Sequence, residues 1–445
     1  MSTNEITPEI QKFMDAATEL HQGAGMGAPD WLKELREQAT QSFISLGFPT
    51  PANEDWKYTS LSHLVKKGFA PYCSGDASIS PEFLETCLLD KCWVRLVFVN
   101  GFYRPDLSGS LEGKGVTVKS LAEAVAEGSE VTEKHLGKIA ISGYNGVVAL
   151  NGALAEDGSL VHIEKDAELD APVFLLHLVS GPVEGAAFPR HLLVADPNSR
   201  ATVIEAFASP FAGSYWSNCV TEVLVDEGAE VDYYRLQQEG PGGFHTSLVQ
   251  ARQEKDSVFS ITTVNLGGVL VRNDVNIYLN GEGCVANLNG LSLVDGTRHV
   301  DNHTALDHAQ AHCESHELYK AILDGKSRSV FNGKIYVHKD AQKTDAKQTN
   351  KNLLLSPDAK VDTKPQLEIF ADDVKCTHGA TVGQLADQEL FYLQSRGLTQ
   401  DAAKRLLMFG FANDIVERIK PHALRHYLEH LLTETFHAPI EVEGV

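Results

Sequence analysis

The stretch Phe331-Asn332-Gly333-Lys334-Ile335-Tyr336-Val337 carries the pattern that decides the fold. Its odd-numbered residues are apolar or small and alternate with polar or amphipathic ones, which is the period of a strand with one buried face. Residues Phe259-Ser260-Ile261-Thr262-Thr263 alternate in the same way. Signals of this kind replace helical ones from about Tyr144 onward, so residues 144–382 are predicted to form an all-β core.

Small or polar residue pairs precede several of the predicted strands and recur at spacings of roughly 27 to 33 residues, a period typical of solenoids. The pairs are Asp166-Ala167, Asn198-Ser199, Gly228-Ala229, Asp256-Ser257 and Gly283-Cys284. A sandwich or barrel is the alternative, because the chain also contains many Asn-Gly and Asp-Gly pairs that suit tight hairpins. In a solenoid several of these pairs must instead close corners of coils. The residues alone leave both architectures open.

Both ends of the chain are predicted to be helical. Within residues 1–143, apolar residues recur every three or four positions from Pro8 to Gly23 and from Asp30 to Gly47, with short strands expected later in this region. The helical period returns in residues 383–445, where Thr399 is predicted to cap a helix. The sequence therefore predicts a β core between two helical regions.

Composition excludes several classes of protein. The 445 residues include 38 basic and 60 acidic ones, a net charge of −22, so the chain lacks the basic face that nucleic acid requires. No run approaches the roughly 20 apolar residues of a membrane helix. The first residues show no signal or transit peptide, so a cytoplasmic location is expected. Seven cysteines without a CxxC pair argue against a disulfide framework and against a four-thiolate zinc site.

Cys376-Thr377-His378 places a thiol and an imidazole two residues apart, so both side chains face the same way on a strand. Thiolate and imidazole suit zinc, copper(I) or iron-sulfur ligation, and a second chain or a substrate cluster would have to supply the remaining ligands. The plainer interpretation is a buried cysteine beside a surface histidine.

A second group of potential ligands comprises His299, His303, His308, His312, Cys313 and His316. Helical spacing would align three of these histidines, but the flanking segments are predicted strands, which would place them on different coils or loops. There is no His-Glu-x-x-His sequence, so a zinc hydrolase is disfavoured. Phosphate-binding loops of the GxxxxGK[ST] type and GxSxG elbows are also absent, which argues against ATP hydrolysis and serine-hydrolase chemistry.

The run Val361–Gly383, VDTKPQLEIFADDVKCTHGATVG, closely resembles the signature of SufD subunits in the SufB/SufD family of the SUF iron-sulfur assembly system. Residues Val330–Gly333 and Phe391–Gly397 resemble flanking parts of the same family. At the N-terminus the resemblance depends mainly on Glu54–Thr59.

This resemblance implies a right-handed parallel β-helix over residues 144–382, flanked by the two helical regions, and a non-catalytic scaffold subunit. Members of the family pair with SufB through the β-helices and bind SufC, an ABC-type ATPase, through the C-terminal helices; a homodimer is expected for the isolated subunit. The resemblance assigns His378 as a ligand of a nascent iron-sulfur cluster, with Cys376 as a second candidate, and a flavin on the complex is a further expectation. The residues expected to contact the ATPase are Phe391, Tyr392, Arg396 and Phe409.

Two other classes of function stay open. A β-helix enzyme acting on carbohydrate would need carboxylates clustered along one face of the solenoid. A homomeric metal-binding structural protein would assemble with itself and would not bind SufC.

Overall fold

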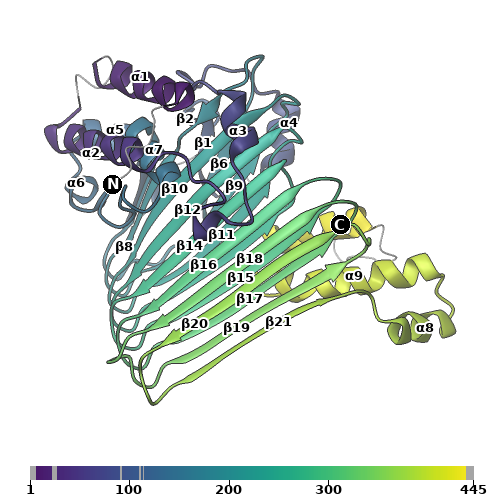
Figure 1. Ribbon diagram of the computed structural model, residues 1–445. Coiled ribbons are helices and arrows are strands. Elements are labelled where there is room, and N and C mark those ends of the chain that lie inside the picture. Colours follow the sequence, from purple (N-terminus) through teal and green to yellow (C-terminus); the bar gives the residue numbers. More distant parts are fainter. Residues whose placement is uncertain (1–6, 23–27, 91–92, 110–111, 114, 437–445) are drawn as a thin grey trace.

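The chain forms a parallel β-solenoid in which two long sheets stack coil on coil, with helices at both ends (Figure 1). The computed structural model describes residues 7–22, 28–90, 93–109, 112–113 and 115–436, so Cys92 lies outside the described residues. Within these ranges, no helix is both long enough and apolar enough to cross a membrane. The predicted β-helix is confirmed, and the sandwich alternative is wrong.

Each sheet grows by one strand per coil. Sheet A runs in the order β20 (Lys360–Ile369), β18 (Arg328–Val337), β16 (His299–His308), β14 (Leu270–Leu279), β12 (Gly243–Gln253), β10 (Tyr215–Val225), β8 (Arg190–Ala195), β5 (Gly158–Ile163), β4 (Val116–Ser120) and β3 (Glu112–Gly113), with β7 (Ala186–Ala187) beside β10. Sheet B runs in the order β2 (Phe102–Tyr103), β1 (Val94–Val99), β6 (Val173–Leu178), β9 (Arg200–Ala208), β11 (Glu230–Gln238), β13 (Val258–Asn265), β15 (Val285–Val294), β17 (Glu314–Leu323), β19 (Asp345–Leu354) and β21 (Lys375–Gly383). Among these strands the pairs β1–β2, β3–β4 and β4–β5 are antiparallel, and the others are parallel.

The helices precede and follow the solenoid. The N-terminal ones are α1 (Pro8–Gln22), α2 (Asp30–Leu46), a 3-10 turn (Glu54–Trp56), α3 (Ser62–Lys67), α4 (Pro81–Cys87), α5 (Leu121–Ala126), α6 (Glu130–His135) and α7 (Gly146–Leu154). The C-terminal ones are α8 (Asp387–Ser395), α9 (Gln400–Val416) and α10 (His422–Phe436). Thr399 caps α9 as predicted, because its side chain accepts a hydrogen bond from the backbone of Ala402.

One corner of each coil is held by a residue in the left-handed backbone conformation. The first residues of all five predicted turn pairs adopt it: Asp166, Asn198, Gly228, Asp256 and Gly283, with φ between 56° and 75°. Each donates its backbone N–H to a carbonyl of the next coil; the bond from Asn198 to Glu227 measures 2.9 Å. The same corner continues at His312 and Lys343, which the pattern missed because neither pair begins with Gly, Asn or Asp. These bonds extend the sheet ladder around the corner and fix its register.

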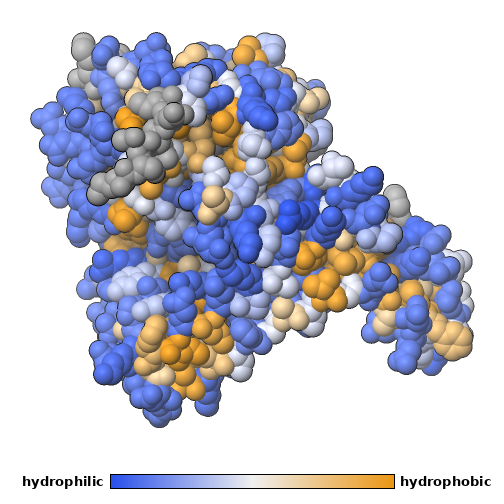
Figure 2. All heavy atoms as spheres, in the orientation of Figure 1, coloured by the Kyte–Doolittle hydropathy of each residue, from blue (hydrophilic) through white to orange (hydrophobic). Residues whose placement is uncertain are grey.

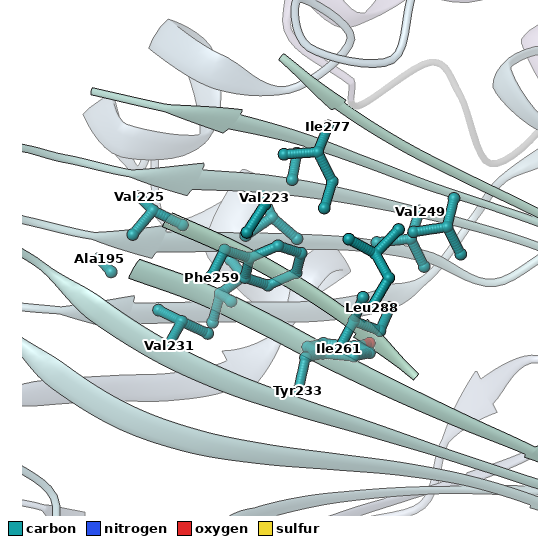
Figure 3. Packing of buried hydrophobic residues seen from close by; sticks show 14 of the residues in the cluster. Ala195, Val223, Val225, Val231, Tyr233, Val249, Phe259, Ile261, Ile277 and Leu288 are labelled. Carbon is teal, nitrogen blue, oxygen red and sulfur yellow. The ribbon is translucent and has the colours of Figure 1, made fainter. Parts of the chain in front are cut away.

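The inside of the solenoid is apolar along one side and polar along the other. Val223, Val249, Phe259 and Ile261 pack between the two sheets in the apolar half (Figure 3). The polar half is a hydrogen-bonded strip whose first members are Glu205, Arg235, Ser247 and Asn273. Along it, Arg235 donates to Glu205 at 2.7 Å and to Ser247 at 2.7 Å, and Ser247 donates to Asn273 at 2.9 Å.

Helices cover the outer faces of both sheets. Phe13 of α1 and Phe43 of α2 pack in one cluster with Trp216 of β10, on the outside of sheet A. On sheet B, α9 and α10 cover the outward residues of β15 and β17. Lys320 fixes α9 there, donating to the carbonyl of Phe411 at 3.0 Å and pairing with the carboxylate of Asp414 at 2.6 Å. The N-terminal helices therefore cover the outer face of sheet A, and the C-terminal helices cover the outer face of sheet B.

The expectation that strands begin near Tyr144 is wrong, because helix α7 occupies residues 146–154. Asn145 caps it by accepting a hydrogen bond from the backbone of Val148 at 2.9 Å, so Asn145-Gly146 is not a hairpin turn. Every residue of α7 is buried. A helix that is apolar on all sides shows no amphipathic period, which explains why the sequence did not reveal it.

Candidate functional site

The solenoid ends in two open sheet edges. Strand β20 pairs with β18 alone and β21 pairs with β19 alone, at the lower end of the molecule in Figure 1. Most residues of β21 are exposed. An exposed edge presents free backbone N–H and C=O groups and can pair with a strand of another chain. The described chain therefore has at this end two sheet edges to which strands of another chain can bind.

Apolar side chains also gather at this end. Figure 2 shows an apolar patch at the lower end of the solenoid. Ile369 and Phe370 are exposed at the corner between β20 and β21, where Phe370 packs against Tyr336 with ring centroids 5.2 Å apart, and Val382 is exposed near the other end of β21. Exposed apolar surface beside a free edge favours a protein interface.

Cys376 and His378 both lie on β21, as the sequence predicted. In the parallel register Cys376 aligns with Ala346 and His378 aligns with Gln348. Ala346 and Gln348 are buried and face the inside of the solenoid. Aligned residues of a parallel ladder point to the same side, so Cys376 and His378 face the mouth of the interior rather than the outer surface.

A buried carboxyl lies two coils below His378, with Gln348 on the coil between them. Gln348 donates to Glu317 at 2.7 Å, and Glu317 is aligned with Gln348 on the neighbouring strand. Burial raises the pKa of Glu317 to about 7, although hydrogen bonds from Thr304 and Gln348 act in the opposite direction. Burial also raises the pKa of the Cys376 thiol. The mouth of the solenoid thus holds a thiol and an imidazole above a carboxyl that titrates near neutral pH.

The histidines between residues 299 and 316 do not form a metal site. His303 and His308 lie on β16, His312 occupies a left-handed corner, and His316 lies on β17. His308 is fully buried and bonded to Ser315 at 2.9 Å. None of these residues belongs to a group of three potential ligands anywhere in the described chain. As the predicted strands implied, these histidines do not share a helix face but are distributed over two strands and the corner between them.

The predicted ATPase-contacting residues are divided between two environments. Phe391 and Tyr392 of α8 are 73% and 56% exposed, and the Arg396 guanidinium lies 5.2 Å from the centre of the Tyr392 ring. They lie on the helices that project from the solenoid in Figure 1. Phe409 of α9 is partly buried in the cluster against sheet B. Phe391, Tyr392 and Arg396 therefore share an exposed surface, whereas Phe409 packs between α9 and sheet B.

One group of potential ligands was missed in the sequence. His177, His191 and Glu205 converge inside the first coils, with their ligand atoms within 4.8 Å of one another. Burial lowers the pKa of His191 to about 4 and that of His177 well below 6.5. Burial acts to raise the pKa of Glu205, but Arg235 and the two imidazoles outweigh it and hold the pKa at about 2. A signal did exist, because these residues recur every 14 positions, which is half a coil.

Two family models match the chain, and together they cover most of it. The model described as SUF system FeS cluster assembly, SufBD core domain, matches residues 177–411. The model described as SufBD protein N-terminal region matches residues 8–175.

Similar proteins come from bacteria and a plant. Iron-sulfur cluster assembly protein SufD of Escherichia coli is 33% identical over 87% of this chain and 89% of its own length. An iron-sulfur cluster assembly SufBD family protein of Synechocystis is 33% identical over 92% of each chain. The chloroplastic protein ABCI7 of Arabidopsis thaliana is 26% identical over 88% of this chain and 84% of its own. The chain therefore belongs to the SufBD family of the SUF system for iron-sulfur cluster assembly, as a SufD-type member.

Proposed function

We propose that this chain is a non-catalytic scaffold subunit that pairs with SufB, binds the SufC ATPase and contributes a ligand to a nascent iron-sulfur cluster at the interface with SufB. The observation that carries the proposal is the position of Cys376 and His378 on one face of the edge strand β21, whose outer edge has no neighbouring strand among the described residues. A ligand pair at a free edge has open coordination positions that a partner chain can complete.

Pairing with SufB would use the edges of β20 and β21. Backbone hydrogen bonds across the edges would continue both sheets into the partner, and the apolar residues Ile369, Phe370 and Val382 would be covered. In the absence of SufB the same edges would favour a homodimer. A homomeric structural protein is the competing interpretation, and the partners recovered from the native host distinguish the two.

Contact with SufC would use the projecting helices. Phe391 and Tyr392 present aromatic surface to solvent, and Arg396 extends this surface with a guanidinium. Aromatic residues and arginine are enriched at the energetic centres of protein interfaces. Nucleotide-driven movement of SufC would then pull on α9, which is fixed to sheet B by Lys320, and would strain the interface that holds the cluster.

The test of the ligand assignment replaces His378 with Ala in the chain co-expressed with SufB and SufC. We expect cluster formation, measured by visible absorbance and by iron and sulfide content, to fall about tenfold or more while the three-subunit complex still elutes intact. His316→Ala on β17 is the matched control, because His316 is partly exposed, with 40% of its side-chain surface accessible, but lies away from the edge. Unchanged cluster formation with His378→Ala would contradict the assignment.

A pull-down of the tagged chain from its native host tests the assembly itself. Recovery of SufB and SufC supports the scaffold, whereas recovery of the chain alone would contradict it. Turnover of a carbohydrate substrate by the purified chain would favour the enzyme alternative instead. The flavin and the cytoplasmic location stay predictions.

A further inference from the structure

His177, His191 and Glu205 lie inside the first coils of the solenoid, remote in sequence from the edge strand β21. They come from β6, β8 and β9, which belong to both sheets, so their side chains meet across the interior. Their relative exposures are 6%, 1% and 0%. The Nε2 atoms of His177 and His191 lie 3.7 and 3.6 Å from the same carboxylate oxygen of Glu205, its Oε1.

The Glu205 carboxylate is held in one orientation by its other oxygen. Oε2 accepts hydrogen bonds from Arg235 Nε at 2.7 Å and from the Tyr233 hydroxyl at 3.0 Å. Oε1 faces the two imidazoles, with the Cys219 thiol 3.3 Å away. Outer partners of this kind orient the carboxylate ligands of metal sites, and here they leave one oxygen directed at the imidazoles.

The two imidazole rings are held in place by packing, but three of their four nitrogens have no hydrogen-bond partner among the described residues. The ring of His177 is stacked between Phe98 and Phe207, with centroids 5.0 and 4.6 Å away. Neither nitrogen of His177 has a hydrogen-bond partner among the described residues, nor does Nε2 of His191. The distances of 3.6 and 3.7 Å to Glu205 are too long for hydrogen bonds. Buried polar atoms are rarely left without a partner, so these nitrogens point to a ligand that the two imidazoles bind together.

The geometry points to a binding site for one divalent transition-metal ion, of the zinc or ferrous class, held by His177, His191 and Glu205. Two imidazoles and a carboxylate form a known ligand set for both ions. An ion about 2.1 Å from each ligand places tetrahedral ligand atoms about 3.4 Å apart. The separations of 3.7 and 3.6 Å from the carboxylate oxygen close with shifts of a few tenths of an ångström. The two imidazole nitrogens, which lie within 4.8 Å of each other, must approach by up to about 1.4 Å. The Cys219 thiol donates to the same Glu205 oxygen at 3.3 Å. The fourth position is therefore taken either by its thiolate, after the side chain moves and the thiol proton leaves to solvent, or by a bound water.

The Ser159 hydroxyl can accept the hydrogen bond that His191 must donate from Nδ1 when its Nε2 binds a metal ion. Nδ1 of His191 accepts from the Ser159 backbone at 3.0 Å and lies 2.9 Å from its hydroxyl oxygen, so without metal the ring proton is on Nε2. Metal binding requires the other tautomer, in which Nδ1–H is donated to the Ser159 hydroxyl oxygen and the Nε2 lone pair is free for the ion. In this tautomer the Ser159 backbone N–H gives up its bond to the ring. The imidazole stays neutral throughout. The ion then joins the two sheets at the start of the solenoid, which is a structural role.

The experiment uses the full-length chain produced in cultures supplemented with zinc, iron or cobalt, followed by dialysis against a chelator and elemental analysis. We expect about one tightly held ion per chain, and visible d–d absorption from tetrahedral cobalt in the cobalt-grown protein. His177→Gln and Glu205→Gln should each reduce the retained metal to less than about a tenth. The buried control His308→Gln lies outside the site and should retain the full amount.

Wild-type protein that retains no transition metal from any of the three cultures would overturn the site. Equal retention by wild type and His177→Gln would also overturn it. The metal content of the wild-type chain tests the proposal by itself, so the test does not depend on whether the variants fold. His378→Ala should keep its metal, so failure of the cluster-ligand assignment and failure of this site give different results. Loss of a thiolate-to-cobalt band in Cys219→Ser would identify Cys219 as the fourth ligand, and an unchanged spectrum would assign that position to water.

Discussion

Replacing Glu317 with Gln is expected to stabilise the chain strongly at pH 8 and weakly at pH 5. Glu317 lies inside the solenoid beneath the candidate ligands, with 3% of its surface exposed. Burial raises its pKa from 4.5 to about 7. The side chain therefore folds most favourably in its neutral form, in which it resembles the glutamine amide in size and shape.

The magnitude follows from proton linkage. Between the two pKa values the folded chain binds more protons than the unfolded chain, so the free energy of unfolding decreases as pH rises from about 4.5 to about 7. At about 1.4 kcal/mol per pKa unit, the ionised carboxylate lowers the free energy of unfolding by about 3 kcal/mol at pH 8 and by less than about 1 kcal/mol at pH 5. Glutamine does not titrate, and its amide oxygen can still accept the bond from Gln348. Glu317→Gln should recover most of this loss.

Urea unfolding followed by circular dichroism at pH 5 and pH 8 measures both values. Glu314→Gln is the matched control, because Glu314 lies on the same strand but is exposed, and its substitution should change little at either pH. A stability gain of the same size at both pH values would refute the argument from titration. A loss at pH 8 would mean that the native site prefers the carboxylate over the neutral acid.

Three further outcomes are expected. Asp301→Asn should lower the free energy of unfolding at pH 7 by about 3 to 5 kcal/mol, because it removes a carboxylate that lies 2.8 Å from the buried Arg272 guanidinium. Burial acts to raise the pKa of Asp301, but Arg272 outweighs it and holds the pKa well below 3.8. The difference in unfolding free energy between wild type and Asp301→Asn should therefore become smaller in urea titrations as the pH falls below 3.8, because the wild-type carboxylate then loses its stabilising charge. Gly158→Ala should cost about 3 kcal/mol in the same assay, since a β-carbon there would lie 1.7 Å from the backbone oxygen of Arg190. Phe391→Ala should weaken SufC binding about tenfold or more by calorimetry without changing the unfolding midpoint, and an unchanged affinity would remove α8 from the proposed contact.

Local chemistry in the sequence determined the elements and the repeat. The alternation in residues 331–337 required a half-buried strand, and the small pairs from Asp166 to Gly283 marked the left-handed corners, because both depend on neighbouring residues alone. The position of Cys376 and His378 on one face of a strand was determined in the same way, since that face depends only on their spacing of two.

Only the tertiary structure decided which distant side chains meet. The flanking strands already indicated that His308, His312 and His316 do not share a face, but only the structure shows which side chains each of them meets. His177, His191 and Glu205 showed no local pattern, and they converge because each half coil advances the chain by 14 residues from one sheet to the other. The free edge of β21 was equally invisible, since an edge is defined by the missing neighbour and not by its own residues. Proximity across a solenoid depends on coil length and register, which are properties of the whole stack and not of any single segment.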